Sequence, residues 1–153
     1  MRYDVNMPRL LLEGSWFVNA PREKLYEIMS DFESMPKNFP TVAKSVSILS
    51  REGNNLTIDA VAPFLGVNLT AHMQTELIPP KGYISHNNSP ITKDGVEKFL
   101  MEEENGGTRI TYTYDIEVRN PLLRVIAKPL IGGFMMWHWK RAVIDRLEVL
   151  ASQ

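Results

Sequence analysis

Residues Pro129 to Leu150 read PLIGGFMMWHWKRAVIDRLEVL, and the rest of the chain is organised around them. Apolar side chains, with one lysine among them, recur in it at steps of three and four, which is the spacing of one face of an α-helix. That face holds Met136, Lys140, Val143, Ile144, Leu147 and Leu150, while Arg141, Asp145 and Glu148 fall on the opposite side. The pattern predicts one long amphipathic helix at the C-terminus.

Most of the chain before this helix reads as strand. Arg9 to Val18 is a first strand, and a period of two then runs from Val42 to Val118. Its clearest strand is Thr108 to Val118, where Ile110, Tyr112, Tyr114, Ile116 and Val118 face one way. The facing of a strand at Gly95 to Glu103 stays open. Two short helices are expected after the first strand, before and after Asp31.

A helix with one apolar face must bury that face against the sheet. The order of strand, two short helices, six strands and a long helix therefore predicts an α+β fold. We expect the sheet to curl around the C-terminal helix and to leave a ligand cavity between them.

Composition limits the function classes. With 153 residues the chain is expected to form a single domain over 1–153, and its 44% hydrophobic and 23% charged residues are ordinary for a soluble protein. The net charge of -1 gives no field that would attract nucleic acid. The chain has no cysteine, its N-terminus lacks a signal-peptide core, and no apolar run reaches the roughly 20 residues of a bilayer span. A cytoplasmic protein is expected.

Several short sequence segments resemble those of the START-like helix-grip superfamily, also called SRPBCC. They are Asn19-Ala20-Pro21-Arg22-Glu23-Lys24-Leu25-Tyr26-Glu27-Ile28 with Ser30-Asp31 and Met35-Pro36, then Gly106-Gly107-Thr108-Arg109-Ile110-Thr111-Tyr112, and Asp145-Arg146-Leu147. The superfamily includes polyketide cyclase/dehydrase-type domains, coenzyme-Q-binding proteins and plant pathogenesis-related ligand carriers. The resemblance implies a seven-stranded antiparallel sheet gripping the C-terminal helix around a mostly apolar cavity.

The candidate ligand-binding residues are those expected to face such a cavity. They are Phe64, Met73, Phe99, Met101, Tyr112, Tyr114, Met136, Trp137 and Lys140. Methionines and aromatic rings suit an adaptable apolar pocket, typically about 300–1,000 Å³ in volume. Plain core packing explains each of them as well. Pro63 to Gly66 is either a lid over the mouth or an ordinary turn.

Lys140 and the two tyrosines are the polar candidates. Lys140 stands in the apolar face of the helix, where it either binds an anionic or carbonyl head group or packs its stem on the core while its charge reaches the rim or pairs with a carboxylate. Tyr112 and Tyr114 either orient a ligand with their hydroxyls or pair within the core. No catalytic residue, cofactor or metal is predicted, because His72, His86 and His138 are scattered and no nucleophile or phosphate motif occurs.

The sequence favours a protein that binds or transports a small hydrophobic molecule, such as a lipid, an isoprenoid quinone or a polyketide-like ring system. One alternative is a cyclase, aromatase or dehydratase, which needs an acid and a base near one reacting atom. Lys140 with a tyrosine could supply them, but the sequence identifies no histidine or carboxylate that clearly points inward. A second alternative is an interaction module that docks through Leu130 to Trp137, with transient membrane contact. An exposed Trp137 with no cavity behind it would favour that module. The oligomeric state stays open.

Overall fold

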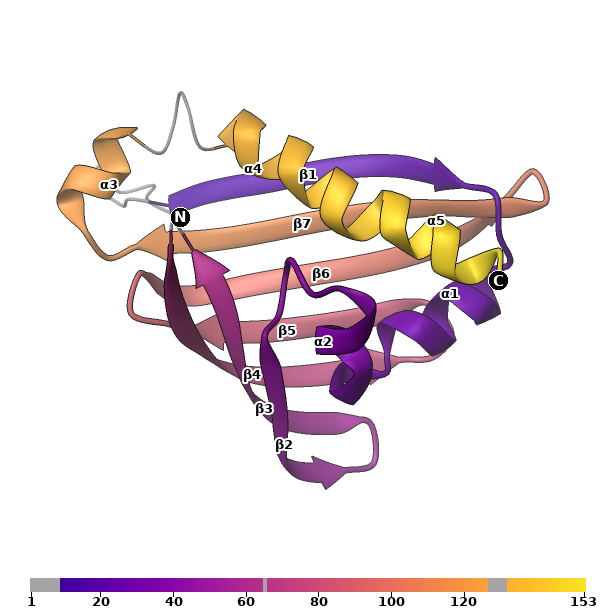
Figure 1. Cartoon of the computed structure of the whole chain (residues 1–153), viewed down its shortest axis with the longest axis horizontal. Helices are drawn as coiled ribbons and strands as arrows, with labels where there is room; N and C mark the ends of the chain where they lie inside the picture. The colour runs from indigo at the N-terminus through magenta and orange to yellow at the C-terminus, as the bar shows by residue number, and fades with distance from the viewer. Residues whose placement is uncertain (1–8, 65, 127–131) are drawn as a thin grey trace, which may run out of the picture.

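A seven-stranded antiparallel sheet forms the body of the protein, in a computed structural model that describes residues 9–64, 66–126 and 132–153 (Figure 1). The strands are β1 (Arg9–Val18), β2 (Ser45–Glu52), β3 (Asn55–Phe64), β4 (Val67–Ile78), β5 (Gly82–Asn88), β6 (Thr92–Glu104) and β7 (Gly107–Val118). Their order is β1-β7-β6-β5-β4-β3-β2, so the first strand pairs with the last. The predicted fold class is confirmed.

The helices fall into three groups. α1 (Arg22–Met29), the 3₁₀ turn η1 (Phe32–Ser34) and α2 (Met35–Asn38) follow β1, and α3 (Pro121–Ile126) follows β7. α4 (Gly132–Trp139), the π-helical η3 (Lys140–Asp145) and α5 (Arg146–Ala151) run on as the long C-terminal helix. The first residues predicted for this helix, 129–131, lie outside the described residues. Within the described ranges, no helix is long and apolar enough to cross a bilayer.

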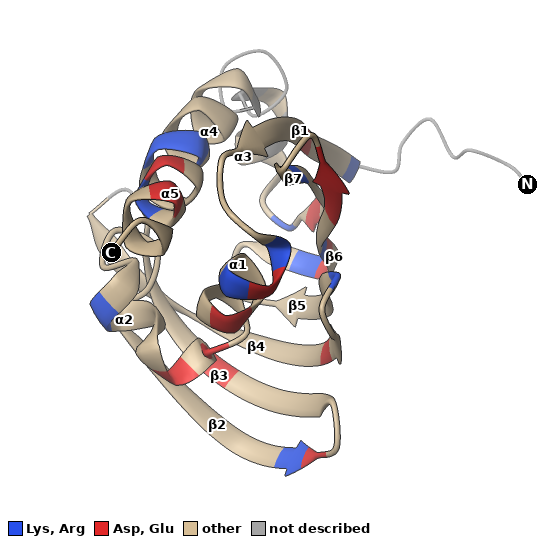
Figure 2. Cartoon of the chain, turned by 90° about the vertical axis from the view of Figure 1, so that its right-hand side faces the viewer, with Lys and Arg blue, Asp and Glu red and all other residues tan. Residues whose placement is uncertain are grey.

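The sheet curves around the C-terminal helix because both bury apolar side chains between them. Figure 2 shows the sheet turning from β1 round to β2, with α4 and α5 opposite its concave side. α1 packs against α5 and places Leu25 and Met29 in the same core. Leu147 on α5 and Ile58 on β3 are fully buried. Burial of each such side chain contributes about 1.5–3 kcal/mol to folding.

The π-helical turn η3 changes which residues of the helix face the sheet. A π turn closes hydrogen bonds from residue i to i+5 and so holds one residue more than an α turn. Val143 and Leu147 are buried, as predicted. On the N-terminal side of the extra residue, however, Trp139 occupies the inward position that the 3.6-residue period assigned to Lys140.

Strand β6 has a definite inward face. Glu97, Phe99 and Met101 point to the concave side of the sheet, while Lys98 and Glu102 are exposed. A register shift between Lys93 and Val96 precedes this alternation. The sequence left this facing open, and the structure places a carboxylate on the inner face.

Candidate ligand-binding cavity

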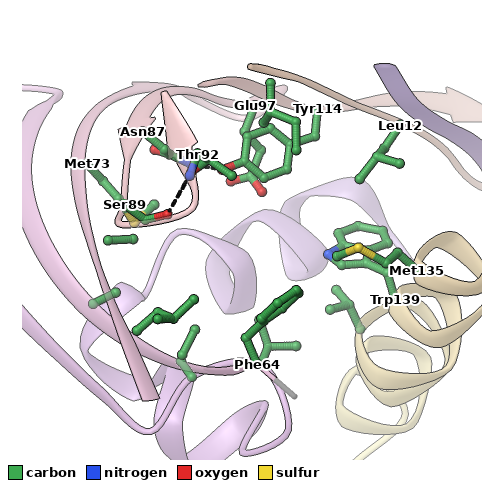
Figure 3. A pocket seen from close by; sticks show the side chains of 18 of the residues that line it. Leu12, Phe64, Met73, Asn87, Ser89, Thr92, Glu97, Tyr114, Met135 and Trp139 are labelled. Atoms are coloured by element: carbon green, nitrogen blue, oxygen red, sulfur yellow. Dashed lines mark hydrogen bonds between the residues drawn. The ribbon is translucent and has the colours of Figure 1, made fainter. Parts of the chain in front are cut away.

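A cavity of about 340 Å³ lies between the concave face of the sheet and the C-terminal helix. Most of its wall is apolar. Figure 3 shows Leu12 from β1, Phe64 from β3, Met73 from β4, and Met135 and Trp139 from α4 around the space. The volume falls in the range of about 300–1,000 Å³ that is usual for small-molecule sites.

The polar groups of the cavity gather on one wall, which we call the polar floor. They come from β5 to β7 and the turn between β5 and β6: Tyr83, Asn87, Ser89, Thr92, Glu97, Tyr112 and Tyr114. The register explains the grouping, since Glu97 lies opposite Ser85 on one side and Tyr114 on the other. Cross-strand partners share a face of the sheet, so their side chains meet there.

Glu97 is the central group of the polar floor. The Tyr112 hydroxyl donates a hydrogen bond of 2.5 Å to its Oε2 atom, and the Tyr83 hydroxyl also bonds to the carboxyl group. Burial raises the pKa of Glu97, and these two hydrogen bonds act in the opposite direction without cancelling it. Among the described residues, no lysine or arginine forms an ion pair with Glu97.

The tyrosines around Glu97 stay protonated. Burial, followed by the charge of Glu97, raises the pKa of Tyr83 and of Tyr112 well above 10. The same two causes raise the pKa of Tyr114 to about 12. Each of these hydroxyls therefore keeps its proton at neutral pH. Those of Tyr83 and Tyr112 donate hydrogen bonds to the Glu97 carboxylate, and that of Tyr114 can donate one to a ligand.

A second hydrogen-bonded chain leads to Tyr114. Thr75 and Ser85 share a bond of 2.9 Å between their hydroxyls, and the Ser85 hydroxyl donates to Asn87 Oδ1 over 2.5 Å. Asn87 Nδ2 then donates a long bond of 3.4 Å to the Tyr114 hydroxyl. This chain satisfies the buried polar groups beside the cavity and holds Tyr114 next to Glu97.

Aromatic rings connect the polar floor to the helix. The Trp139 ring stacks on Tyr112 with centroids 3.9 Å apart, and it lies 5.4 Å from Trp16 and 6.2 Å from Phe99. Gly14 makes room for this cluster, because a Cβ atom there would lie 2.3 Å from the Trp16 ring. Two members of the cluster, Tyr112 and Trp139, form part of the cavity wall.

The structure brings five of the nine predicted residues to the cavity wall. They are Phe64, Met73, Tyr112, Tyr114 and Met136. Phe99 and Met101 face inward but are completely covered, with exposed fractions of 0% and 1%, so they belong to the core beside the cavity. A role in binding a ligand stays a prediction for the five that line the wall.

Trp137 and Lys140 were candidates for the cavity wall, but neither lines it, and for Lys140 the structure shows the alternative in which its charge pairs with a carboxylate. Lys140 Nζ pairs with Asp145 Oδ1 at 2.8 Å, and both side chains are about half exposed. Trp137 is 55% exposed, and the Arg141 guanidinium carbon lies 4.9 Å from the centre of its ring. The extra residue of the π turn is the reason, since it moves the inward face of α4 by one position.

Sequence reasoning missed Glu97 and Trp139. Glu97 stands two residues before Phe99 and four before Met101, so strict alternation from these apolar residues would have placed it inward. The sequence identified no inward carboxylate because it left the facing of this strand open, and the structure supplies one. No comparable signal marks Trp139, because the position of a π turn is not visible in the residue pattern.

The remaining site hypotheses have mixed outcomes. His72, His86 and His138 are exposed, His72 pairs with Asp59 at 2.6 Å, and no group of metal-binding side chains occurs in the described part of the chain. Phe134 and Trp137 are exposed on α4, but Leu130 lies outside the described residues, and a cavity does lie behind this helix. Leu65 of the suggested lid also lies outside them. The single domain and the cytoplasmic location stay predictions.

Comparison with protein families gives a match over most of the chain. The family model described as polyketide cyclase/dehydrase and lipid transport matches residues 18–134. A search of curated protein sequences finds no match.

Solved structures share the whole architecture. Protein TTHA0849 from Thermus thermophilus is 19% identical, with a TM-score of 0.77 over 94% of this chain and 99% of the other. The Zhui aromatase/cyclase from Streptomyces sp. R1128 is 15% identical, with a TM-score of 0.75 over 94% of each chain. A START superfamily protein from Mycobacterium smegmatis is 20% identical, with a TM-score of 0.73 over 92% of this chain and 98% of the other. The fold is thus a START-like helix-grip fold.

Proposed function

We propose that this chain, which belongs to the polyketide cyclase/dehydrase and lipid transport family, binds and carries one small, largely hydrophobic molecule. The molecule occupies the cavity between the sheet and the C-terminal helix. The observation that carries the proposal is the cavity of about 340 Å³ with its mostly apolar wall. Transfer of an apolar ligand from water into such a space supplies the binding free energy. Lipids, isoprenoid quinones and polyketide-like rings are candidate ligand classes.

Identification of a natural ligand is the direct test. The gently purified protein is analysed by native mass spectrometry, and the bound material is extracted into organic solvent and identified. We expect one apolar small molecule per chain. Protein that is free of such a molecule, and that also fails to bind 2-methylnaphthalene, would contradict the proposal.

A matched pair of variants places the binding in the cavity. Ala71 lines the cavity from β4, and its neighbour Thr70 is exposed on the other face of the same strand. Ala71→Phe should fill the space and weaken binding of 2-methylnaphthalene by about tenfold or more, which corresponds to about 1.4 kcal/mol. Thr70→Phe should change it less than about twofold. Equal effects of the two variants would place the binding elsewhere.

The second candidate function is acid–base catalysis on a carbonyl compound, and Glu97 is the observation that favours it. A carboxylate with a raised pKa beside the Tyr114 hydroxyl supplies a base and a hydrogen-bond donor on one wall. In such a reaction Glu97 takes a proton from the carbon next to the carbonyl, and Tyr114 donates a hydrogen bond to the enolate oxygen.

Deuterium exchange tests this candidate. The methyl protons of 2-acetonaphthone are followed by NMR in heavy water with the protein present. An enzyme should speed their exchange, and Glu97→Gln should remove the acceleration while 2-acetonaphthone still binds. Exchange at the rate of the buffer alone, with the ketone bound, assigns the cavity to carriage.

A further inference from the structure

The polar floor of the cavity contains a carboxylate that has no positively charged partner among the described residues. Glu97 lines the cavity, and the two groups bonded to its carboxyl group, Tyr83 and Tyr112, are neutral donors. Removal of a carboxylate from water costs free energy that two neutral hydrogen bonds offset only in part, which agrees with the raised pKa of Glu97. A ligand can supply the missing hydrogen-bond donor or positive charge.

Glu97 also has hydrogen-bonding capacity left. A carboxylate offers about four lone-pair sites, and the Tyr112 and Tyr83 hydroxyls use two of them. The other polar side chains of the wall bond to one another: Ser89 to Thr92 over 2.8 Å, and Asn87 to both Ser85 and Tyr114. Glu97 therefore has acceptor sites left that can accept a hydrogen bond from a donor group of a ligand.

The surroundings define the rest of such a ligand. Figure 3 shows Glu97 and Tyr114 side by side on one wall, with Phe64, Met135 and Trp139 across the space. A molecule that fills the cavity has one end at Glu97 and an apolar body against these three side chains. A second negative charge at Glu97 would be repelled, because the low-dielectric walls screen it poorly.

We propose that this cavity selects hydrophobic molecules with a hydrogen-bond donor, a hydroxyl or an ammonium group, at one end, and that Glu97 accepts that donor and excludes hydrophobic carboxylates. The inference rests on the proposed ligand binding and adds the chemistry of the polar end. Fatty-acid-like anions are therefore poor ligands, and alcohols and amines of the same size are good ones.

Four probes with the same ring system test the proposal. 2-Naphthalenemethanol is a neutral donor, 2-naphthylmethylamine is a cationic donor, 2-naphthoate is an anion, and 2-methylnaphthalene has no polar group. Dissociation constants are measured by isothermal titration calorimetry in mildly alkaline buffer. We expect the wild-type protein to bind the amine or the alcohol about tenfold or more tightly than naphthoate, a difference of about 1.4 kcal/mol.

Two variants on strand β6 assign the selection to one side chain. Glu97→Gln removes the charge and keeps the size, so it should weaken binding of the amine and strengthen binding of naphthoate by about tenfold each, with 2-methylnaphthalene within about twofold. The dissociation constant of the alcohol should change little, because the glutamine oxygen also accepts the hydrogen bond that holds it. Glu102→Gln, exposed on the same strand, should leave all four constants unchanged.

The outcomes separate this inference from the proposed function. Binding of 2-methylnaphthalene together with equal affinities for naphthoate, amine and alcohol would overturn the selection and leave ligand carriage standing. Failure of all four probes to bind would overturn both. If Glu97→Gln does not fold, as judged by near-ultraviolet circular dichroism, the ranking of the probes by the wild-type protein decides.

Discussion

The polar floor and the C-terminal helix face each other across the same cavity with opposite chemistry. The floor presents Glu97, which is bonded to tyrosines on both adjacent strands, and Tyr114, which is bonded to Thr92 on adjacent β6 and to Asn87 on β5 beyond it. The helix presents Met135, Met136 and Trp139, which offer no charged group. The charged and hydrogen-bonding side chains of the cavity are therefore concentrated in the sheet, while the helix contributes mainly apolar wall.

The difference has a structural cause. Adjacent strands can support a buried polar group from both sides, because cross-strand partners lie about 5 Å apart on one face. Charged residues on the helix can instead turn to the surface and pair there, as Lys140 does with Asp145. The polar floor should thus respond to changes of charge, and the helix should respond to changes of volume.

Truncation of the helix wall should give the largest effect. Trp139→Ala removes the ring that stacks on Tyr112 and should lower the free energy of unfolding by about 3 kcal/mol, because it leaves a void among Trp16, Phe99 and Tyr112. Urea denaturation measures it. The control is Trp137→Ala on the exposed side, for which we expect a loss below about 1 kcal/mol. Equal losses would contradict the assignment of Trp139 to the wall.

Removal of one hydroxyl from the polar floor should have the next largest effect. Tyr112→Phe deletes the 2.5 Å bond to Glu97 and should cost about 2 kcal/mol of unfolding free energy at neutral pH, the usual range for a bond to a charged group. It should also raise the pKa of Glu97 further. Tyr114→Phe, which loses the 3.4 Å bond from Asn87 and a bond with Thr92, both to neutral groups, should cost about 1 kcal/mol. The reverse ranking would show that Glu97 does not depend on Tyr112.

The pH dependence of stability should reveal Glu97. Its pKa in the folded protein is raised above the usual 4.5, so the unfolded chain loses this proton first as the pH rises. The wild-type protein should therefore lose stability relative to Glu97→Gln from about pH 4.5 upward, until the folded pKa is passed. Below pH 4.5 the difference between the two proteins should be constant. Urea denaturation across this range measures the two free energies of unfolding, and a wild-type protein that gains stability relative to Glu97→Gln as the pH rises would refute the prediction.

The smallest effect is expected at Lys140. Lys140→Met breaks a half-exposed ion pair, so the free energy of unfolding should change by less than about 0.5 kcal/mol. Binding of 2-methylnaphthalene should not change, because the side chain lies outside the cavity. A loss of binding comparable to that of Ala71→Phe would return Lys140 to the site.

The sequence predicted the elements better than the site. Arg9 to Val18 is a strand with the predicted bounds, and the alternation from Thr108 places Tyr112 and Tyr114 inward as expected. These predictions succeeded because the side-chain period of a strand is two wherever the pairing is regular. The order of the elements, with the long helix last, followed from the same periods.

The sequence analysis failed at two places, Glu97 and the inward face of the C-terminal helix, because a general rule does not hold at either. A carboxylate is normally assigned to the solvent side, and only the alternation with Phe99 and Met101 argued that Glu97 points inward. Tyr83 and Tyr112, which stabilise it there, lie on other strands and could not be connected to it before the register was known. The helix face was predicted with an α-helical period, and the π turn made that period wrong for α4.

The π turn also bears on how this chain can change its length. A π turn contains one residue beyond the α-helical count, so deletion of exposed Arg141 would leave Trp139 and Val143 three positions apart, which is still one face of an α-helix. Both cavity walls would keep their side chains. The middle of the C-terminal helix is thus a place where evolution can delete one residue while the cavity keeps its lining side chains.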